Sequence, residues 1–415
     1  MKEVRLGDVA DVRISGIDKK TLPNEIPVRL CNYTDVYYNW AIREEKSQTF
    51  MFASAKQDEI AKFRLRAGQV AITKDSETRD DIGHATFIAN DFDDVILGYH
   101  CALITPHTGK LDGRYLNALF RMQYVSDYLS RNAGGSGQRY YLSESAIRSI
   151  PLFLPPINAQ LRIAGVLGSI DEKIELNRKK IAELEALAKT IYDYWFVQFD
   201  FPDKNGKPYK SSGGKMVWND LLKREVPERW EVLCLPQMAN YLFGNPFDSS
   251  LFNSNGEGFP IVRIRNVKNG RTNDYTTEPA SQEYIITNGD FIIGMDGYFD
   301  MNHWIGGDAY LVQRACRISA KDDLYAAWLS LSLAAPIKYL EKSLTGATLA
   351  HLGKAHLDKI VLSVPPRSLS NVLLCLNGIV EQKVHLGVAN LVLEKQRDFL
   401  LPLLMNGQVS VGDLK

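Results

Sequence analysis

The chain contains an internal repeat with a period of about 210 residues. Segment 143–156 reads SESAIRSIPLFLPP and segment 353–366 reads GKAHLDKIVLSVPP, with a pair of prolines at the same place in both. The same offset aligns Tyr115 with Tyr325 and Lys173 with Lys383. A sequence repeat is the signature of a duplicated architecture. We therefore expect two domains of similar fold, each followed by a long helix, related by a pseudo-twofold axis.

Length and charge agree with this division. At 415 residues the chain is longer than one hydrophobic core usually serves. Lys and Arg together number 49, as do Asp and Glu, so the formal net charge is zero. The chain therefore lacks the excess positive charge of many nucleic-acid-binding proteins, although a neutral total is compatible with one basic face.

Cysteine and histidine positions indicate an intracellular chain without a metal site. The five cysteines lie far apart with no C-x-x-C pair, and the seven histidines have no metal-binding spacing. The first residues contain no apolar run that resembles a signal peptide, and no stretch reaches the roughly 18 uncharged apolar residues of a membrane span. We expect reduced thiols, a cytoplasmic location and no membrane partner.

Short β-like runs mixed with helical patches predict two α+β domains, each with a small sheet. The expected strands are 26–30, 69–73, 85–88 and 95–97 in the first domain, and 260–264, 290–293 and 309–312 in the second. Helices are expected near 115–130 and 324–341. We expect the domains to span 1–155 and 201–365, with long helices over 156–200 and within 366–415.

The first long helix carries a heptad pattern. Its apolar positions recur at spacings of four and three, which is typical of a coiled coil. The predicted seam consists of Ile163, Leu167, Ile170, Ile174, Asn177, Ile181, Leu184, Ala188, Ile191 and Trp195. Asn177 is its polar residue, and a buried polar seam residue fixes register. We expect this helix to pack antiparallel against the helix near 368–404.

Segment 155–196 reads PPINAQLRIAGVLGSIDEKIELNRKKIAELEALAKTIYDYWF. With its proline pair, heptad and seam asparagine in this order, it resembles the central region of the specificity subunit of type I restriction-modification systems. The C-terminal copy departs from that pattern, because Gly387 stands where Asn177 does.

The resemblance implies a non-catalytic DNA-binding subunit. Each domain would read one half of a bipartite, asymmetric duplex target, and the helix pair would set the spacer and dock two methyltransferase subunits. Two restriction or translocase subunits are possible further partners. S-adenosylmethionine would belong to the methyltransferase partner, and ATP and Mg²⁺ to the restriction partner, so that this chain needs no cofactor.

Three alternatives stay open at this point. The chain could serve a methyltransferase-only or type IIB-like system, be an enzyme with its own methyltransferase or nuclease site, or be a coiled-coil assembly protein without DNA. The sequence contains no glycine-rich S-adenosylmethionine loop, Walker A lysine loop or H-E-x-x-H motif, which argues against the enzyme.

A glycine-rich loop at 134–141 is the strongest candidate for DNA contact. Glycines allow the backbone to approach phosphates, while Gln and Arg can bond to phosphate or to a base edge. The candidates in this loop are Ser136, Gln138, Arg139 and Tyr140. Arg139 is the best single candidate, with an exposed flexible loop as the alternative.

The other candidates lie in polar loops that follow predicted strands. They are Lys74, Ser76 and Arg79 in the first domain and Arg263, Arg265, Tyr298 and Thr348 in the second. We expect Arg263 and Arg265 to face one side of a strand at 261–267, because alternate strand residues share a face. Surface salt bridges would explain this arginine pair equally well.

Overall fold

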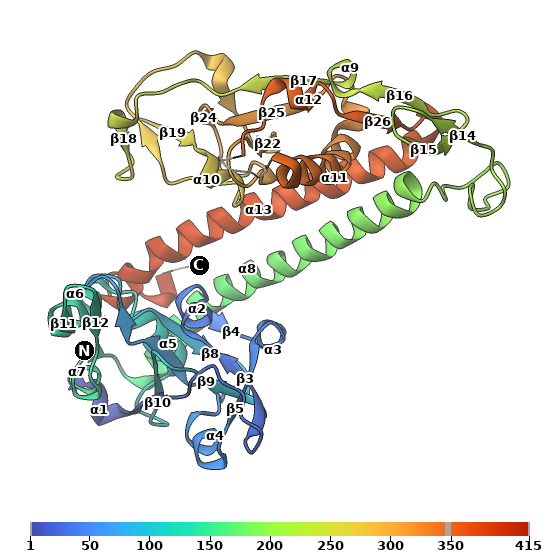
Figure 1. Cartoon of the computed structure of the whole chain (residues 1–415). Coiled ribbons are helices and arrows are strands. Elements are labelled where there is room, and N and C mark those ends of the chain that lie inside the picture. Colours follow the sequence, from blue (N-terminus) through green and yellow to red (C-terminus); the bar gives the residue numbers. More distant parts are fainter. Residues whose placement is uncertain (1, 345–349, 414–415) are drawn as a thin grey trace. The chain divides into compact units, whose positions relative to one another are not determined.

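The computed structural model describes residues 2–344 and 350–413 (Figure 1). The chain divides into two compact units, one formed by Met1–Lys173 with Leu393–Lys415 and the other by Ile174–Val392. We call them the first and the second unit. Each unit contains one α+β domain together with a part of each long helix.

In the first domain, residues 2–155 form thirteen strands and seven short helices. The strands are β1 (Lys2–Arg5), β2 (Ala10–Ile14), β3 (Ile26–Cys31), β4 (Ala41–Ile42), β5 (Met51–Ala55), β6 (Val70–Thr73), β7 (Asp75–Ser76), β8 (Ala85–Ile88), β9 (Val95–Leu97), β10 (Cys101–Pro106), β11 (Gly134–Ser136), β12 (Arg139–Tyr141) and β13 (Pro151–Leu154). The helices are α1 (Leu6–Val9), α2 (Tyr33–Tyr37), α3 (Glu44–Ser47), α4 (Gln57–Phe63), α5 (Gly113–Leu119), α6 (Gln123–Asn132) and α7 (Glu144–Arg148).

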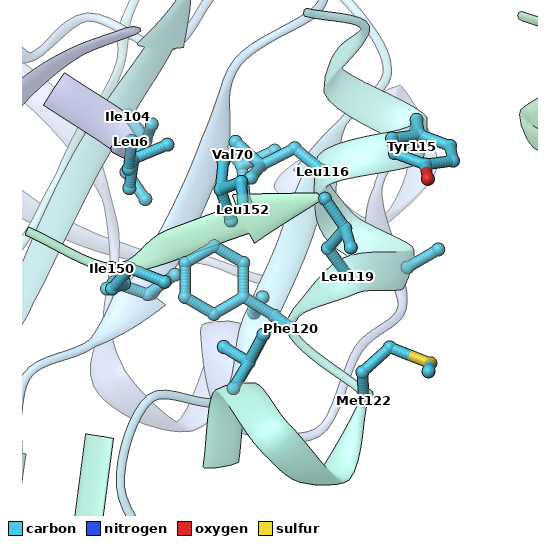
Figure 2. Packing of buried hydrophobic residues seen from close by; sticks show 14 of the residues in the cluster. Leu6, Val70, Ile104, Tyr115, Leu116, Leu119, Phe120, Met122, Ile150 and Leu152 are labelled. Atoms are coloured by element: carbon cyan, nitrogen blue, oxygen red, sulfur yellow. The ribbon is translucent and has the colours of Figure 1, made fainter. Parts of the chain in front are cut away.

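The main sheet of the first domain has the strand order β2-β10-β6-β8-β4. Every residue of β6 is buried, as expected for a central strand whose two faces are both covered. A second sheet, β5-β3-β9, packs its own apolar cluster, and β1 pairs antiparallel with β13. Figure 2 shows how Leu6 of α1, Val70 of β6 and Leu116 of α5 gather around the strand that carries Leu152. The core thus joins elements from both ends of the domain sequence.

The second domain contains its own set of sheets. Its strands are β14 (Met216–Asn219), β15 (Arg224–Pro227), β16 (Glu231–Cys234), β17 (Ala239–Phe243), β18 (Phe252–Asn253), β19 (Phe259–Val262), β20 (Tyr275–Thr276), β21 (Ile285–Ile286), β22 (Phe291–Gly294), β23 (Met301–His303), β24 (Ala309–Leu311), β25 (Ala315–Ala320) and β26 (Val361–Val364). Its helices are α9 (Leu235–Met238), α10 (Ile264–Val267), α11 (Ala326–Leu344) and α12 (Lys354–Leu357).

The strand pairing confirms that the two domains are copies of one fold. In the second domain β16 pairs with β26, as β1 pairs with β13 in the first. The order β17-β25-β22 likewise matches β2-β10-β6. Each domain also has a second sheet, β5-β3-β9 in the first and β18-β20-β19-β24-β21 in the second, and each of these sheets contains a parallel pair, β3 with β9 and β19 with β24. The second domain differs in the additional strands β18 and β21 and in a hairpin of β14 and β15. The copies therefore share a central sheet and differ in the segments inserted around it.

The two long helices are α8 (Ile157–Tyr192) and α13 (Ser370–Met405), and α8 continues into a π-helical turn at Asp193–Val197. In the second unit they pair antiparallel, because Asn177 meets Asn390 and Glu185 meets Lys383. In the first unit Leu167 of α8 and Leu404 of α13 belong to one apolar cluster. Each predicted seam residue is buried or half-buried, as a coiled-coil seam requires.

Helix α13 is long and apolar enough to cross a membrane, judged by length and composition alone. Its apolar side chains are nevertheless used inside the protein. Leu373 and Leu376 are fully buried in the core of the second unit, and Leu401 and Leu404 are buried in that of the first. Packing against two domains thus accounts for a helix that is apolar on more than one face.

The structure corrects two predictions of local geometry. Arg263 and Arg265 do not share a strand: β19 ends at Val262, Arg263 is the N-cap of α10, and Arg265 lies in that helix. The backbone N–H of Arg263 donates to Oδ1 of Asn266 at 2.7 Å, so that the side chain at N3 reaches back to the N-cap residue as in a capping box. The helix predicted near 115–130 is two helices, α5 and α6, because the chain turns at 120–122 to bury Phe120 and Met122.

Candidate nucleic-acid interface

In the first domain, two of the predicted loops meet in one small sheet. Strand β7 follows β6 directly and pairs with β12, whose hairpin partner is β11. Gly135 in this hairpin has a φ of 104°, and a Cβ there would lie 2.2 Å from the carbonyl oxygen of Arg139. Glycine is therefore required for the hairpin that brings Arg139 beside β7.

Asp75 lies on β7, an edge strand of this sheet, and its carboxylate is close to three basic side chains. Lys74 Nζ donates to its carboxylate at 2.9 Å, His100 Nδ1 lies 2.5 Å away, and the Arg139 guanidinium lies 3.8 Å away. Burial raises the pKa of Asp75, but the hydrogen bonds from Lys74 and His100 outweigh burial, so that the pKa falls below its ordinary value. The carboxylate is 10% exposed, whereas the Arg139 side chain is 58% exposed. We call Asp75, His100 and Arg139 the Asp75 cluster.

An open pocket of about 610 Å³ lies over this cluster. It is lined by Tyr33, Thr34, Tyr37, Tyr38, Asp75, Ser76, Glu77, Thr78, Asp81, His100, Gln138 and Arg139. The pocket thus brings together three predicted residues, Ser76, Gln138 and Arg139. It presents aromatic rings, carboxylates and a guanidinium, groups that can contact base faces, cytosine amino groups and guanine edges respectively.

Several lining residues were not among the predicted site residues. Tyr37 donates from its hydroxyl to Asp81 at 2.8 Å, and His84 Nε2 lies 2.7 Å from the same carboxylate. Tyr38 is largely exposed. The run YTDVYY at 33–38 was a possible signal, since aromatic residues this dense are unusual in an exposed helix.

The second domain contains a similar cluster, which the sequence analysis did not predict. His351 Nδ1 lies 2.5 Å from one carboxylate oxygen of Asp296, and Arg314 lies 3.2 Å from the other. The Asp296 side chain is 19% exposed and that of Arg314 is 54% exposed. We call Asp296, Arg314 and His351 the Asp296 cluster.

The two carboxylates occupy equivalent positions in the two copies. Lys74 follows β6, and Met295 follows β22. Each donates its backbone N–H, at 2.8 Å, to the carbonyl oxygen of the residue that precedes the neighbouring strand of the sheet, β10 in the first domain and β25 in the second. Those acceptors are His100 and Arg314, and both have a positive φ, 71° and 77°. Such backbone is uncommon outside glycine. Asp75 and Asp296 each follow one residue later.

The His and the Arg have exchanged places between the copies. In the first domain the histidine precedes the sheet strand and the arginine lies on the hairpin. In the second domain the arginine precedes the sheet strand, and His351 lies on the segment that bridges to Asp296. Each domain thus combines one carboxylate, one imidazole and one exposed guanidinium, but presents the guanidinium from a different element.

Three other candidates in the first domain have partners in the fold. The Lys74 ammonium also lies 5.6 Å from the centre of the Tyr99 ring. The Arg79 guanidinium lies over the Tyr140 ring at 5.2 Å. These contacts hold Lys74, Arg79 and Tyr140 beside the pocket, and contact of any of them with DNA stays a prediction.

The second-domain candidates are dispersed. The Arg263 guanidinium lies 5.2 Å from the centre of the Phe252 ring, and Arg265 forms an ion pair with Asp274. Tyr298 is 80% exposed on the loop after β22. Thr348 lies outside the described residues. Within residues 2–344 and 350–413, no group of three or more His, Cys, Asp or Glu side chains could hold a metal ion.

Comparison with known proteins agrees with this architecture. Residues 1–186 and 227–369 match the family model of the type I restriction modification DNA specificity domain. The EcoBI specificity subunit of Escherichia coli is 27% identical over 201 residues, which cover 47% of this chain and 42% of that protein. The HindI specificity subunit of Haemophilus influenzae is 23% identical over 470 aligned positions, which cover 98% of this chain and 99% of that protein.

A solved structure shows the same fold. The S subunit of a type I restriction-modification system from M. genitalium superposes with a TM-score of 0.55 at 14% identity, covering 97% of this chain and 95% of that one. The family match covers most of the sequence and includes both copies of the repeat. This chain therefore belongs to the type I restriction-modification DNA specificity family.

Proposed function

We propose that this chain is the non-catalytic, cytoplasmic specificity subunit of a type I restriction-modification complex, and that each domain reads one half of a bipartite duplex target. The observation that carries this proposal is the duplicated cluster: Asp75 and Asp296 occupy equivalent places in a duplicated fold, and each contacts an exposed arginine. Because the arginine comes from different elements, the two domains would read different half-sites. An asymmetric target follows.

The proposed partners are two methyltransferase subunits and, in a complete system, two restriction subunits. The long helices support docking, because each carries apolar side chains outside the seam: Leu161, Leu176 and Leu187 on α8, and Leu374, Val392 and Phe399 on α13, all exposed. Exposed apolar residues of this kind are typical of protein interfaces. S-adenosylmethionine, ATP and Mg²⁺ would be bound by the partners.

The first test is methylation. We expect the isolated chain to transfer no methyl group from labelled S-adenosylmethionine to DNA above a control without protein. The complex isolated from its host through a tag on this chain is expected to methylate DNA. Methylome sequencing of the host with and without the gene should show a split, adenine-methylated motif that disappears on deletion. Methyl transfer by the chain alone would contradict the non-catalytic proposal.

The second test is exchange of one domain. Replacing residues 1–155 by the first domain of another family member should change one half of the methylated motif and leave the other half intact. A change in both halves, or in neither, would contradict the assignment of one half-site to each domain.

The third test concerns the spacer. Inserting four residues near Ala182 adds about 6 Å of helix and disrupts the heptad register. We expect an altered spacer or loss of binding, with unchanged half-site sequences. An insertion variant with the original spacing and affinity would show that the helices do not set the distance.

A further inference from the structure

We propose that Arg314 in the second domain and Arg139 in the first each read a guanine in the major groove, and that Asp296 and Asp75 are the positioning residues that aim them. This inference rests on the proposed function, since it names the base that each cluster would recognise. It adds Arg314, Asp296 and His351 to the candidate residues of the second domain, where the sequence had indicated Arg263, Arg265, Tyr298 and Thr348.

The geometry leaves part of each guanidinium free for a ligand. A guanidinium has five N–H donors, and the contacts of Arg314 with Asp296 and His351 involve one nitrogen, NH1. Arg139 likewise contacts Asp75 and His100 through NH2. The remaining N–H groups can form the paired hydrogen bonds that guanine O6 and N7 accept. A carboxylate that fixes one end of the guanidinium limits the directions in which the other end points.

The histidine supports the carboxylate rather than the ligand. In both clusters the histidine Nδ1 lies 2.5 Å from the carboxylate. The arginine nitrogen is farther from the same carboxylate, at 3.8 Å in the first domain and 3.2 Å in the second. The aspartate is mostly buried in each case, so that it cannot reach far into solvent. The exchange of His and Arg between the chain positions of the two copies keeps all three chemical groups together. This exchange therefore indicates that the three side chains together, Asp, His and Arg, form the functional site in each domain.

Electrostatics favour a base edge over a phosphate as the ligand in the first domain. The pocket around Arg139 is lined by the carboxylates of Asp75, Glu77 and Asp81. Negative charges so close repel a phosphate, whereas a base edge is neutral. A side chain that binds a phosphate also needs little orientation, because a lysine ammonium can bind it as a point charge. A guanidinium held among carboxylates is suited to a neutral acceptor pair such as that of guanine.

The test uses the complex isolated from its host through a tag on this chain, with random duplexes and with the selected target. The wild-type complex first has to select a split motif. Failure at this step would contradict the proposed function itself, before any variant is considered. The motif then serves as the reference for variants in each half-site.

Arg314→Lys keeps the positive charge but removes the paired donors. We expect one guanine of the second half-site to lose its preference, with affinity for that target falling roughly 5- to 150-fold, and the first half-site unchanged. Arg139→Lys should do the same in the first half-site alone. Arg367→Lys is the matched control, because Arg367 is an exposed arginine of the second unit paired with Asp322 outside the cluster. It should leave the motif unchanged.

Asp296→Asn separates positioning from folding. We expect the guanine preference to weaken while binding to unrelated duplexes stays equal or rises, because a negative charge beside DNA is removed. Asp296→Glu should restore part of the preference. A purely structural residue would instead lower binding to all duplexes alike. Equal loss on all duplexes for Arg314→Lys, or an unchanged motif for both Arg314 and Asp296 variants, would overturn the inference.

Discussion

The two domains are attached to the long helices by different chemistry. In the first unit, Arg43 forms an ion pair with Asp171 of α8 at 2.8 Å. The Trp40 ring lies near two guanidinium groups, Arg397 of α13 at 4.5 Å and Arg121 at 5.1 Å. In the second unit, α13 contacts the domain through the neutral side chain of Asn377, and the ion pair of Arg367 with Asp322 lies just before the helix. Asn377 of α13 accepts from the backbone of Ala327 at 3.0 Å and donates to that of Asp323 at 2.9 Å.

This difference shows that a duplicated fold does not preserve the chemistry of its contacts. Burial and the neighbouring Arg397 lower the pKa of Arg121 in the first unit. In the second unit, burial lowers the pKa of His303 to about 3, so that the imidazole is neutral at pH 7. An ion pair loses stability when one partner is removed, because the other charge is left buried and unpaired. A contact between neutral groups loses stability when side-chain volume is added or when a neutral group becomes protonated.

Removal of Asp171 should have the largest effect. Asp171→Ala leaves the partly buried Arg43 without its carboxylate, and we expect a loss of about 3 kcal/mol in the free energy of unfolding. The double variant Arg43→Leu with Asp171→Leu should lose less, because no uncompensated charge remains. Urea denaturation measures both. Asp58→Ala, which breaks the exposed pair with Lys62, is the control and should cost under about 1 kcal/mol. Equal losses for Asp171→Ala and Asp58→Ala would contradict the proposal that the Arg43–Asp171 ion pair stabilises the attachment of the first domain to α8.

Added volume should disturb the second unit. A Cβ on Gly387 would lie 3.1 Å from a side-chain carbon of Ile305, so that Gly387→Leu should destabilise by about 2 kcal/mol through overpacking. A Cβ on Gly378 in the same helix would meet no neighbouring side chain within 4 Å, and Gly378→Ala should stabilise by about 1 kcal/mol. Thermal denaturation compares the two. Stabilisation by Gly387→Leu would show that the contact with Ile305 is loose.

The seam asparagines give a smaller effect. Asn177 Nδ2 donates to Asn390 Oδ1 at 2.8 Å, and both residues are buried. Asn177→Ala should cost about 1–2 kcal/mol, because the Asn390 oxygen loses its donor. Replacing both by Leu should restore or exceed wild-type stability but weaken the register. A double-mutant cycle measures the coupling. Additive single losses would contradict a paired interaction.

The smallest expected effect is a pH dependence in the second unit. His303 is neutral when folded and binds a proton near pH 6.5 when unfolded, so that its contribution disfavours the folded state as pH falls below 6.5. At pH 5.5 the cost is roughly 1 kcal/mol. His303→Gln should therefore show a shallower loss of stability between pH 7 and 5.5 than the wild type. Identical slopes would contradict a neutral buried imidazole.

The sequence predicted the elements that depend on local pattern. The repeat indicated two α+β domains, and the copies of the β2-β10-β6 order confirm the duplication. The predicted strands 85–88 and 95–97 occur with the same bounds as β8 and β9. Heptad spacing identified which face of α8 is buried, because side chains three and four residues apart lie on one face of a helix.

Tertiary structure alone decided which distant side chains meet. Asn177 finds its partner in Asn390, three residues beyond the Gly387 that the repeat aligned with it, since an antiparallel pair follows its own register and not the sequence offset. The Asp75 and Asp296 clusters each join three separate segments. Periodicity reports which face of an element is buried, but strand pairing and helix register decide which residues lie opposite one another. The side chains that we propose for DNA recognition depend on that second kind of information.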